Sequence, residues 1–372
     1  HGVWNPIAKL DIFWQIPDSS DYMNLYVPTH HNAQYRMHLE MTVPLKVPIL
    51  LLGGAGVSKT TTIVQFIHER CAKDGLAMKR AALSFNTTPF ALQRVIENAV
   101  ERRQGRVYGP SHYRSCSVLI DDVNVTCIGK WGDQPCSEFL RQLLSENGFY
   151  NIDKPGEWKN IVDLQYYATM THSGGRMQND IPSRLKRRML PINMPAPPPS
   201  AVEHIVTTVF NAHFSEKMVG RDIALVASKF AEPTVTIWNT LRERLSHHSS
   251  KFHYNYTMKD ISNVLSGMLR CSRSLFPPGK DGKEYVARLW KHEIERALTD
   301  KLDCTSDQTM AESYIQETVS EALADVKHLS TQHFGKYYFG AFPLEESIES
   351  QEFTETEDVS YLQPYDLCLS AE

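Results

Sequence analysis

The chain has 372 residues, of which 42% are hydrophobic and 22% charged, and its formal net charge is −4. This length predicts two or three domains with a sizeable buried core. The small negative charge offers no basic footprint for nucleic acid. No run of eighteen apolar residues occurs, so we expect no membrane-spanning helix.

The cysteines and the first residues of the chain further restrict the class of protein. The seven cysteines are scattered without a C-x-x-C pair, so we expect reduced thiols in a cytosolic compartment rather than disulfides or a zinc site. The chain begins at His1 with neither a methionine nor a signal-like apolar segment, so we expect a piece of a longer protein. Residues 1–45 are rich in aromatics and prolines without clear periodicity, and we expect an extended segment that packs on the following domain.

Residues 46–62, KVPILLLGGAGVSKTTT, combine an apolar run, a glycine-rich turn and the polar start of a helix. This order of strand, loop and helix cradles a nucleotide phosphate with backbone N–H groups. Lys59 would supply the positive charge, and Thr60 a ligand for Mg²⁺. The template G-x-x-x-x-G-K-[ST] is met except at Ser58, where the second glycine belongs. A strand and turn without function is the alternative. The predicted nucleotide contacts in this loop are Gly53, Gly54, Ala55, Gly56, Val57, Ser58, Lys59, Thr60 and Thr61.

Strands and helices alternate after this loop. We expect a helix over residues 60–71, a short strand over 81–85, and a helix beginning at Thr88-Pro89 whose apolar residues recur at helical spacing through residue 100. The basic residues 102, 103 and 106 would end that helix, with phosphate or partner binding as the alternative. A strand over 115–120, a helix over 137–147 stopped by Gly148, and a strand over 161–170 follow. This alternation predicts a parallel sheet covered on both faces.

The proline-rich run at residues 191–199 marks a domain boundary, because prolines stop both helices and central strands. Ser200 and Glu203 give a capping-box signal for a helix over 201–214. The pattern then stays mostly helical to residue 329. Two apolar stripes, through residues 290–302 and 315–326, predict core packing rather than a cofactor site. Residues 339–372 become acidic, which is typical of a solvated or linking segment.

The strand at residues 117–122, SVLIDD, supplies the second half of a nucleotide site. Asp121 would hold the metal, and Asp122 stands where ATPases carry the carboxylate that orients the attacking water. Two acids ending a strand could also be a simple turn. The phosphate loop earlier in the chain favours the site.

The whole chain is similar to the third AAA+ module of a dynein heavy chain of the axonemal type. The similarity rests on segments in order: DSSDYMNLYVPT, the phosphate loop, ERRQGRVYGP, LIDDVNV, WGDQP, EFLRQLL, Gly174-Gly175-Arg176, PSRLKRRM, HYNYTMKDIS, RLWKHEIERAL and YYFGAFP. It implies an α/β AAA+ P-loop fold, with a parallel sheet flanked by helices and an all-helical lid. The implied divisions are a lead-in segment from the preceding module at 1–45, the large subdomain at 46–195, the lid at 196–335, and a linker into the next module at 336–372.

The resemblance also implies a setting. Six such modules would form a ring on one long polypeptide that moves toward microtubule minus ends by ATP hydrolysis, in the cytoplasm, on the cytoskeleton and in the axoneme of a cilium. The implied partners are the neighbouring modules of the same heavy chain, dynein intermediate and light chains, and microtubules, which other parts of the chain would contact. Neither nucleic acid nor membrane is implied. The main hydrolysis site would lie in another module.

The resemblance assigns further site residues and shows departures. Arg184 and Arg187 match arginines that face a neighbouring module's nucleotide, and a basic surface turn is their alternative reading. Lys259 stands where related modules have a lid arginine, so the charge is kept and the bidentate fork is lost. Asp122 replaces a glutamate. The strand expected to end in a water-sensing asparagine ends instead in Met170-Thr171-His172.

Three functions stay open on this sequence. The first is a regulatory site that binds ATP or ADP with Mg²⁺ and hydrolyses slowly or not at all. The second is a structural spacer in the ring that holds ADP or no nucleotide. The third, a free-standing AAA+ remodeller or a P-loop kinase, is disfavoured because both ends of the chain match junctions with neighbouring modules.

Overall fold

The computed structural model describes residues 26–74, 77–111, 115–172, 178–245, 248, 250–271, 280–322, 338–340 and 366–368. The chain divides after Pro197 into two compact units. The first contains residues 30–197 and is built on a parallel sheet. The second contains residues 26–29 and resumes at Pro198, and its described part is mainly helical. The predicted fold class, an α/β unit followed by a helical unit, is confirmed.

The central sheet of the first unit has five strands in the order β2-β5-β8-β1-β9, and all four pairings are parallel. Its strands are β1 (Ile49–Gly53), β2 (Ala77–Ala82), β5 (Cys116–Asp121), β8 (Leu164–Thr171) and β9 (Leu190–Met194). Gly53 lies opposite Thr171 on one side and Met194 on the other. The carboxyl ends of the strands therefore meet at one edge, where open α/β sheets bind ligands.

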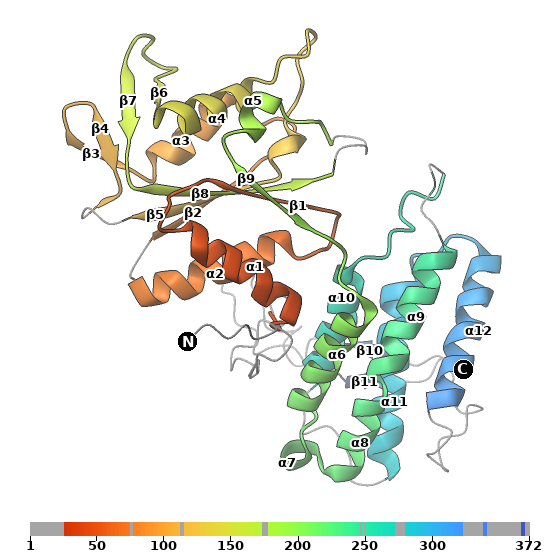
Figure 1. Cartoon of the computed structure of the whole chain (residues 1–372). Helices are drawn as coiled ribbons and strands as arrows, with labels where there is room; N and C mark the ends of the chain where they lie inside the picture. Colours follow the sequence, from red (N-terminus) through yellow and green to blue (C-terminus); the bar gives the residue numbers. More distant parts are fainter. Residues whose placement is uncertain are drawn as a thin grey trace, which may run out of the picture. The chain divides into compact units, whose positions relative to one another are not determined.

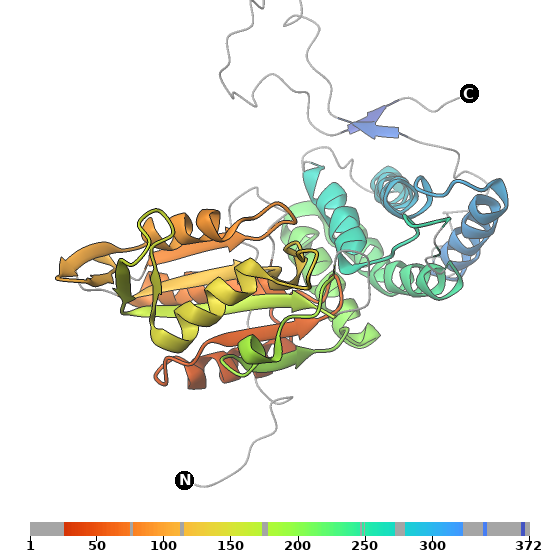
Figure 2. The same cartoon turned by 90° about the horizontal axis from the view of Figure 1, so that it is seen from above.

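Helices cover both faces of this sheet (Figure 1). Helices α1 (His30–Thr42) and α2 (Lys59–Asp74) lie on one face, and α3 (Pro89–Glu97), α4 (Pro135–Glu146) and α5 (Ser183–Lys186) lie on the other. Strand residues alternate between two cores: Ile49 and Leu51 pack toward α2, whereas Leu50 packs toward α3 and α4. Both faces are buried, which is why the strands read as continuous apolar runs. Seen from above, the strands lie side by side (Figure 2).

A second, smaller sheet lies beside the helices α3 and α4 (Figure 1). Its strands, in the order β3-β4-β7-β6, are β3 (Glu101–Gln104), β4 (Val107–Gly109), β6 (Gly148–Tyr150) and β7 (Trp158–Ile161). These strands come from two hairpin insertions that separate α3 from β5 and α4 from β8. The sequence signalled neither insertion.

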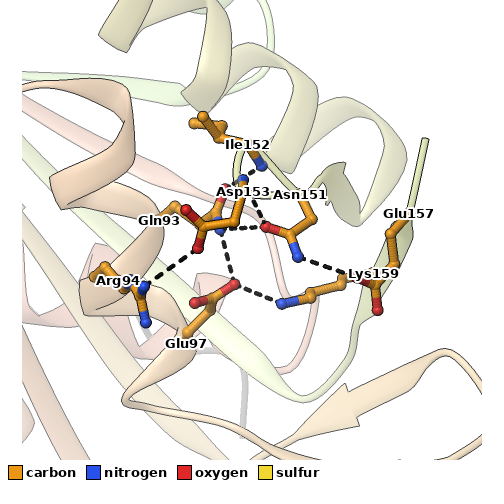
Figure 3. A network of polar contacts seen from close by, with 8 residues as sticks. All are labelled: Gln93, Arg94, Glu97, Asn151, Ile152, Asp153, Glu157 and Lys159. Carbon is orange, nitrogen blue, oxygen red and sulfur yellow. Dashed lines mark hydrogen bonds and ion pairs between the residues drawn. The ribbon is translucent and has the colours of Figure 1, made fainter. Parts of the chain in front are cut away.

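A buried polar network joins α3 to the second hairpin (Figure 3). The fully buried Gln93 donates from Nε2 to Glu97 Oε1 and Asn151 Oδ1, both at 2.9 Å. Its Oε1 accepts the Ile152 N–H at 2.9 Å, and Lys159 Nζ donates to Glu97 Oε1 at 2.7 Å. Because one amide satisfies donors and acceptors on both elements, this network fixes the hairpin to the helix.

The second unit packs its helices around aromatic side chains. Its helices are α6 (Pro199–His213), α7 (Glu216–Val219), α8 (Arg221–Lys229), α9 (Ala231–Arg244), α10 (Met258–Arg270), α11 (Lys280–Ile294), a π-helical turn (Glu295–Thr299) and α12 (Thr305–Ala322). Trp290 is fully buried, stacks on Phe230 at 4.5 Å and donates to Thr234 Oγ1 at 2.8 Å. The predicted core role of the stripe through Trp290 is confirmed. The strands β10 (Tyr338–Gly340) and β11 (Asp366–Cys368) pair antiparallel.

Several local predictions in the first unit are wrong. The segment expected to be extended contains helix α1, whose Leu39 packs into the core against α2. Helix α3 begins as predicted, with Thr88 Oγ1 accepting the Ala91 N–H, but it ends at Glu97. Arg102 and Arg103 therefore lie on β3 and Arg106 lies in the turn that follows, so none of the three ends a helix. Arg103 instead pairs with Asp163 at 2.6 Å, so an ion pair rather than a helix terminus explains its charge.

Three further boundaries differ from the predictions. Helix α4 ends at Glu146, its cap residue Asn147 has left-handed backbone with φ 50°, and Gly148 starts β6 instead of stopping the helix. Pro191 lies inside β9, where it is tolerated because β9 is at the edge of the sheet and, among the described strands, pairs with β1 alone. The Ser200 capping box is absent: α6 starts at Pro199, so the serine hydroxyl is already past the cap position. None of the described helices is long and apolar enough to cross a membrane.

Candidate functional site: a phosphate loop facing a carboxylate strand

The loop that joins β1 to α2 adopts left-handed backbone at two positions. Gly56 has φ 74° and Ser58 has φ 66°. Gly53, the last residue of β1, is closely confined, since a Cβ there would lie 2.6 Å from the Met194 carbonyl oxygen. The glycine-rich sequence therefore permits a turn that runs directly from a buried strand into the N-terminus of α2 at Lys59. This is the geometry that exposes backbone N–H groups to an anion.

Lys59 lies inside this loop. Its residue is only 7% exposed, and Nζ donates to the carbonyl oxygens of Gly53 at 3.0 Å and Gly54 at 2.7 Å. Burial lowers the pKa of the lysine, while the carboxylates of Asp122 and Asp121 act in the opposite direction. The ammonium group is thus held against the loop itself, where it could turn from the carbonyls to a phosphate.

Asp121, at the end of β5, is the convergence point of the site. Its side chain is 8% exposed, and its two carboxylate oxygens accept three hydrogen bonds from described side chains. Oδ1 accepts from Thr60 Oγ1 at 2.8 Å and from Thr169 Oγ1 at 2.6 Å. Oδ2 accepts from the Arg80 guanidinium at 2.6 Å. The structure therefore brings together the predicted pair Thr60 and Asp121, and adds two residues that the sequence analysis missed.

Asp122 follows in the left-handed region with φ 57° and begins a short 3₁₀ turn, Val123–Val125. Its N–H donates to Thr169 Oγ1 at 3.0 Å, whereas its carboxylate accepts no hydrogen bond from any residue the structure describes. Burial raises the pKa of Asp122, as does the nearby Asp121 charge, and Lys59 and Arg80 oppose this. A carboxylate at this edge without a partner among the described side chains can accept a hydrogen bond from water.

The end of β8 carries Thr171 opposite Gly53, and the following His172 is exposed. Asn124, 1% exposed, donates from Nδ2 to the Thr171 carbonyl oxygen at 3.0 Å. Its Oδ1 is buried without a hydrogen-bond partner among the described residues. The family resemblance implied an asparagine at the end of β8 itself, so Asn124 was not among the predicted site residues. It reaches the same strand end from the turn after β5.

Three predicted site residues make no described contact with the residues of this cluster. Arg184, on α5, is 70% exposed and pairs with Glu138 Oε1 at 2.6 Å. Arg187 is exposed and makes no ion pair with a described residue. Lys259 is exposed in the first turn of α10 and belongs to the second unit. The segment Gly174-Gly175-Arg176 lies outside the described residues.

The donor set fits a magnesium–nucleotide group. Mg²⁺ binds oxygen ligands from one or two protein side chains and keeps waters and phosphates as the rest. The Thr60 hydroxyl and the Asp121 carboxylate, 2.8 Å apart, offer hard oxygen donors beside the loop. Among the described residues no group of three or more His, Cys, Asp or Glu side chains is arranged to hold a metal unaided. A metal here would therefore need phosphate oxygens.

Comparison with known proteins agrees with this geometry. Residues 14–197 match the family described as the P-loop containing dynein motor region, and residues 209–308 match the dynein heavy chain ATPase lid domain. A solved structure of NtrX from Brucella abortus, in complex with ADP, covers 84% of this chain and 68% of its own at 12% identity with a TM-score of 0.43, a likeness too low to support an argument.

Curated relatives are dynein heavy chains. The flagellar outer arm dynein gamma chain of Chlamydomonas reinhardtii is 34% identical over 81% of this chain, and dynein axonemal heavy chain 5 of Rattus norvegicus is 32% identical over 84%. This chain spans only 7% and 9% of the lengths of those two proteins. A P-loop AAA fold implies nucleotide binding. The chain is therefore a dynein-motor AAA region followed by its ATPase lid domain, homologous to axonemal dynein heavy chains.

Proposed function

We propose that this chain is the third module of its motor ring, and that it binds ATP or ADP with Mg²⁺ as a regulatory site with slow or absent hydrolysis. The observation that supports this proposal is the contrast between the two sides of the site. Lys59, Thr60 and Asp121 form a connected phosphate and metal side. The side that would handle the attacking water has only the short, unpartnered Asp122 and no asparagine on β8.

The binding side would act through groups that are already positioned. Lys59 would exchange its two loop carbonyls for phosphate oxygens, a substitution that keeps its hydrogen bonds and adds charge complementarity. Thr60 donates its proton to Asp121 and so keeps its oxygen lone pairs available to a metal ion. A bound Mg²⁺ would neutralise phosphate charge. The N-terminus of α2 would further favour the anion.

The hydrolytic side is incomplete in two respects. The carboxylate of Asp122 is one methylene shorter than the glutamate of hydrolysing modules, so it reaches less far toward a water. The β8 end offers the Thr171 carbonyl, which Asn124 already engages at 3.0 Å. The loss of one positioned contact typically costs about 10²-fold or more in rate. Two such losses predict slow turnover even when ATP is bound.

We further propose the roles that depend on neighbouring parts of the motor. Arg184 and Arg187 would face a neighbouring module's nucleotide, and their exposure leaves them accessible to a partner. Lys259 would approach the phosphates when residues 196–335 act as the lid. The neighbouring modules, intermediate and light chains and microtubules of an axonemal motor would be its partners. A cilium axoneme would be its location, in keeping with the flagellar and axonemal names of its relatives.

One observation favours the alternative of a structural spacer. Lys59 and Asp121 already hydrogen-bond with the chain's own groups, so both charged side chains have partners without a ligand. Single-turnover hydrolysis separates the two functions. Restoring the three residues together (Ser58→Gly, Asp122→Glu, Thr171→Asn) should raise the rate above that of the unchanged chain, because residues that act on one water do not contribute additively.

The control for this experiment is Asp121→Ala, which should lower both Mg²⁺-dependent binding and turnover. Fast ATP turnover by the unchanged chain would contradict the regulatory reading. Bound nucleotide with no gain from the triple substitution would favour the spacer.

A further inference from the structure

Arg80 places a positive charge on the carboxylate that the proposed function assigns to Mg²⁺. It lies on β2, two residues before the strand ends, and β2 pairs in register with β5. Met78, two residues earlier, is partly buried and packs against the core that contains α2, so Arg80 lies on the same face of β2 as Met78. The guanidinium donates to Asp121 Oδ2 at 2.6 Å, and its side chain is 52% exposed.

The three hydrogen-bond donors to Asp121 differ in whether they allow a cation to bind beside them. Thr60 and Thr169 donate hydroxyl protons to Oδ1 and retain oxygen lone pairs, so both are compatible with a cation nearby. Arg80 has only N–H donors and carries a full charge, so it cannot share Oδ2 with a cation or with a water bound to that cation without repulsion. Lys59 already brings a second positive charge to the same cluster.

We propose that Arg80 is a built-in counter-ion that competes with Mg²⁺ for Asp121 Oδ2. In the nucleotide-free module it balances the charge of the Asp121 carboxylate. When a magnesium nucleotide binds, the guanidinium must release Oδ2, and its exposed position lets it swing into solvent. This competition weakens the dependence of nucleotide affinity on Mg²⁺. The inference rests on the proposed function in naming the competing cation.

The test compares the unchanged 372-residue chain with Arg80→Ala and Arg80→Lys. Arg102→Ala is the matched control, because Arg102 is an exposed arginine on β3 that donates to the Gly105 carbonyl within its own hairpin. ADP affinity is measured by calorimetry with Mg²⁺ and again with EDTA. The readout is the dissociation constant in EDTA divided by the dissociation constant in Mg²⁺. A merely structural loss would weaken both affinities and leave the ratio unchanged.

Arg80→Ala should raise the ratio about tenfold, the order of one charge-assisted hydrogen bond. The ratio for Arg80→Lys should lie between those of the unchanged chain and Arg80→Ala. The ratio for Arg102→Ala should equal that of the unchanged chain. Equal ratios in all four chains would overturn the proposal. If no chain binds ADP, the proposed nucleotide site is wrong and the competition proposed for Arg80 fails with it. Equal ratios in chains that do bind ADP overturn the role of Arg80 alone and leave the nucleotide site standing.

Discussion

The serine at the end of the phosphate loop should be replaceable by glycine with a gain in stability. Ser58 has φ 66°, so its backbone lies in the left-handed region that residues with a Cβ avoid. A non-glycine residue there costs roughly 1–2 kcal/mol. Glycine removes that strain but adds freedom to the unfolded chain, which offsets about 0.4–1 kcal/mol. Ser58→Gly should therefore raise the free energy of unfolding by about 0.5–1 kcal/mol.

Scanning calorimetry of the nucleotide-free chain measures this gain. For a unit of this size, a change of that order raises the midpoint of the first unit's transition by about 2 °C. Two controls isolate the cause. Gly105→Ser, at φ 59° in an open hairpin turn away from the loop, should destabilise by about 1 kcal/mol. Ser313→Gly, on the exposed face of α12, should destabilise by about 0.5 kcal/mol because helices disfavour glycine.

The same serine-to-glycine change is thus expected to act with opposite signs at two positions. A destabilising Ser58→Gly, equal in sign to Ser313→Gly, would refute the assignment of backbone strain to the loop. The variant is also informative with nucleotide present. A smaller residue crowds the phosphates less, so ADP affinity should rise or stay equal, and a loss of affinity would show that the serine side chain contributes to binding.

Two further predictions concern the scaffold around the site. Arg103 holds the pKa of Asp163 below its ordinary value; the stability this carboxylate contributes is present above its unfolded pKa of about 3.9 and is lost as pH falls through the lower folded pKa. The cost of Asp163→Asn in urea unfolding should therefore be visible at pH 7 and shrink toward pH 3, and a constant cost would contradict the ion pair. Gln93→Ala should lower the free energy of unfolding by about 2–3 kcal/mol, because it strips buried partners such as Asn151. Gln65→Ala, which loses one bond within α2, should cost less than about 0.5 kcal/mol, and equal costs would refute the network's role.

The strongest local signals in the sequence located the phosphate loop. An apolar run, glycines and a lysine are contiguous, so one stretch of chain predicts strand β1, the turn and a helix from Thr60, and α2 begins one residue earlier at Lys59. Thr88-Pro89 predicted the start of α3 for the same reason, since cap and helix are neighbours in sequence. The strand before Asp121 was predicted in the same way, from a contiguous apolar run.

The missed residues have a common cause. Arg80 and Thr169 reach Asp121 only because β2 and β8 flank β5 in the sheet, and sheet order follows from packing that no local pattern encodes. The short strands of the second sheet are three or four residues long, too short for alternation to stand out. Pro191 argued against a strand, although an edge position tolerates it.

The central claim is that the loop from Gly53 to Thr60 holds a nucleotide. The most direct measurement is the nucleotide that the purified chain retains, released by acid and identified by chromatography, together with labelled ADP titrated into the emptied protein. We expect the unchanged chain to bind ADP, and Lys59→Ala to bind none while it keeps its folded transition in calorimetry. A folded Lys59→Ala chain with unchanged affinity, or no binding by the unchanged chain at millimolar nucleotide, would contradict the account.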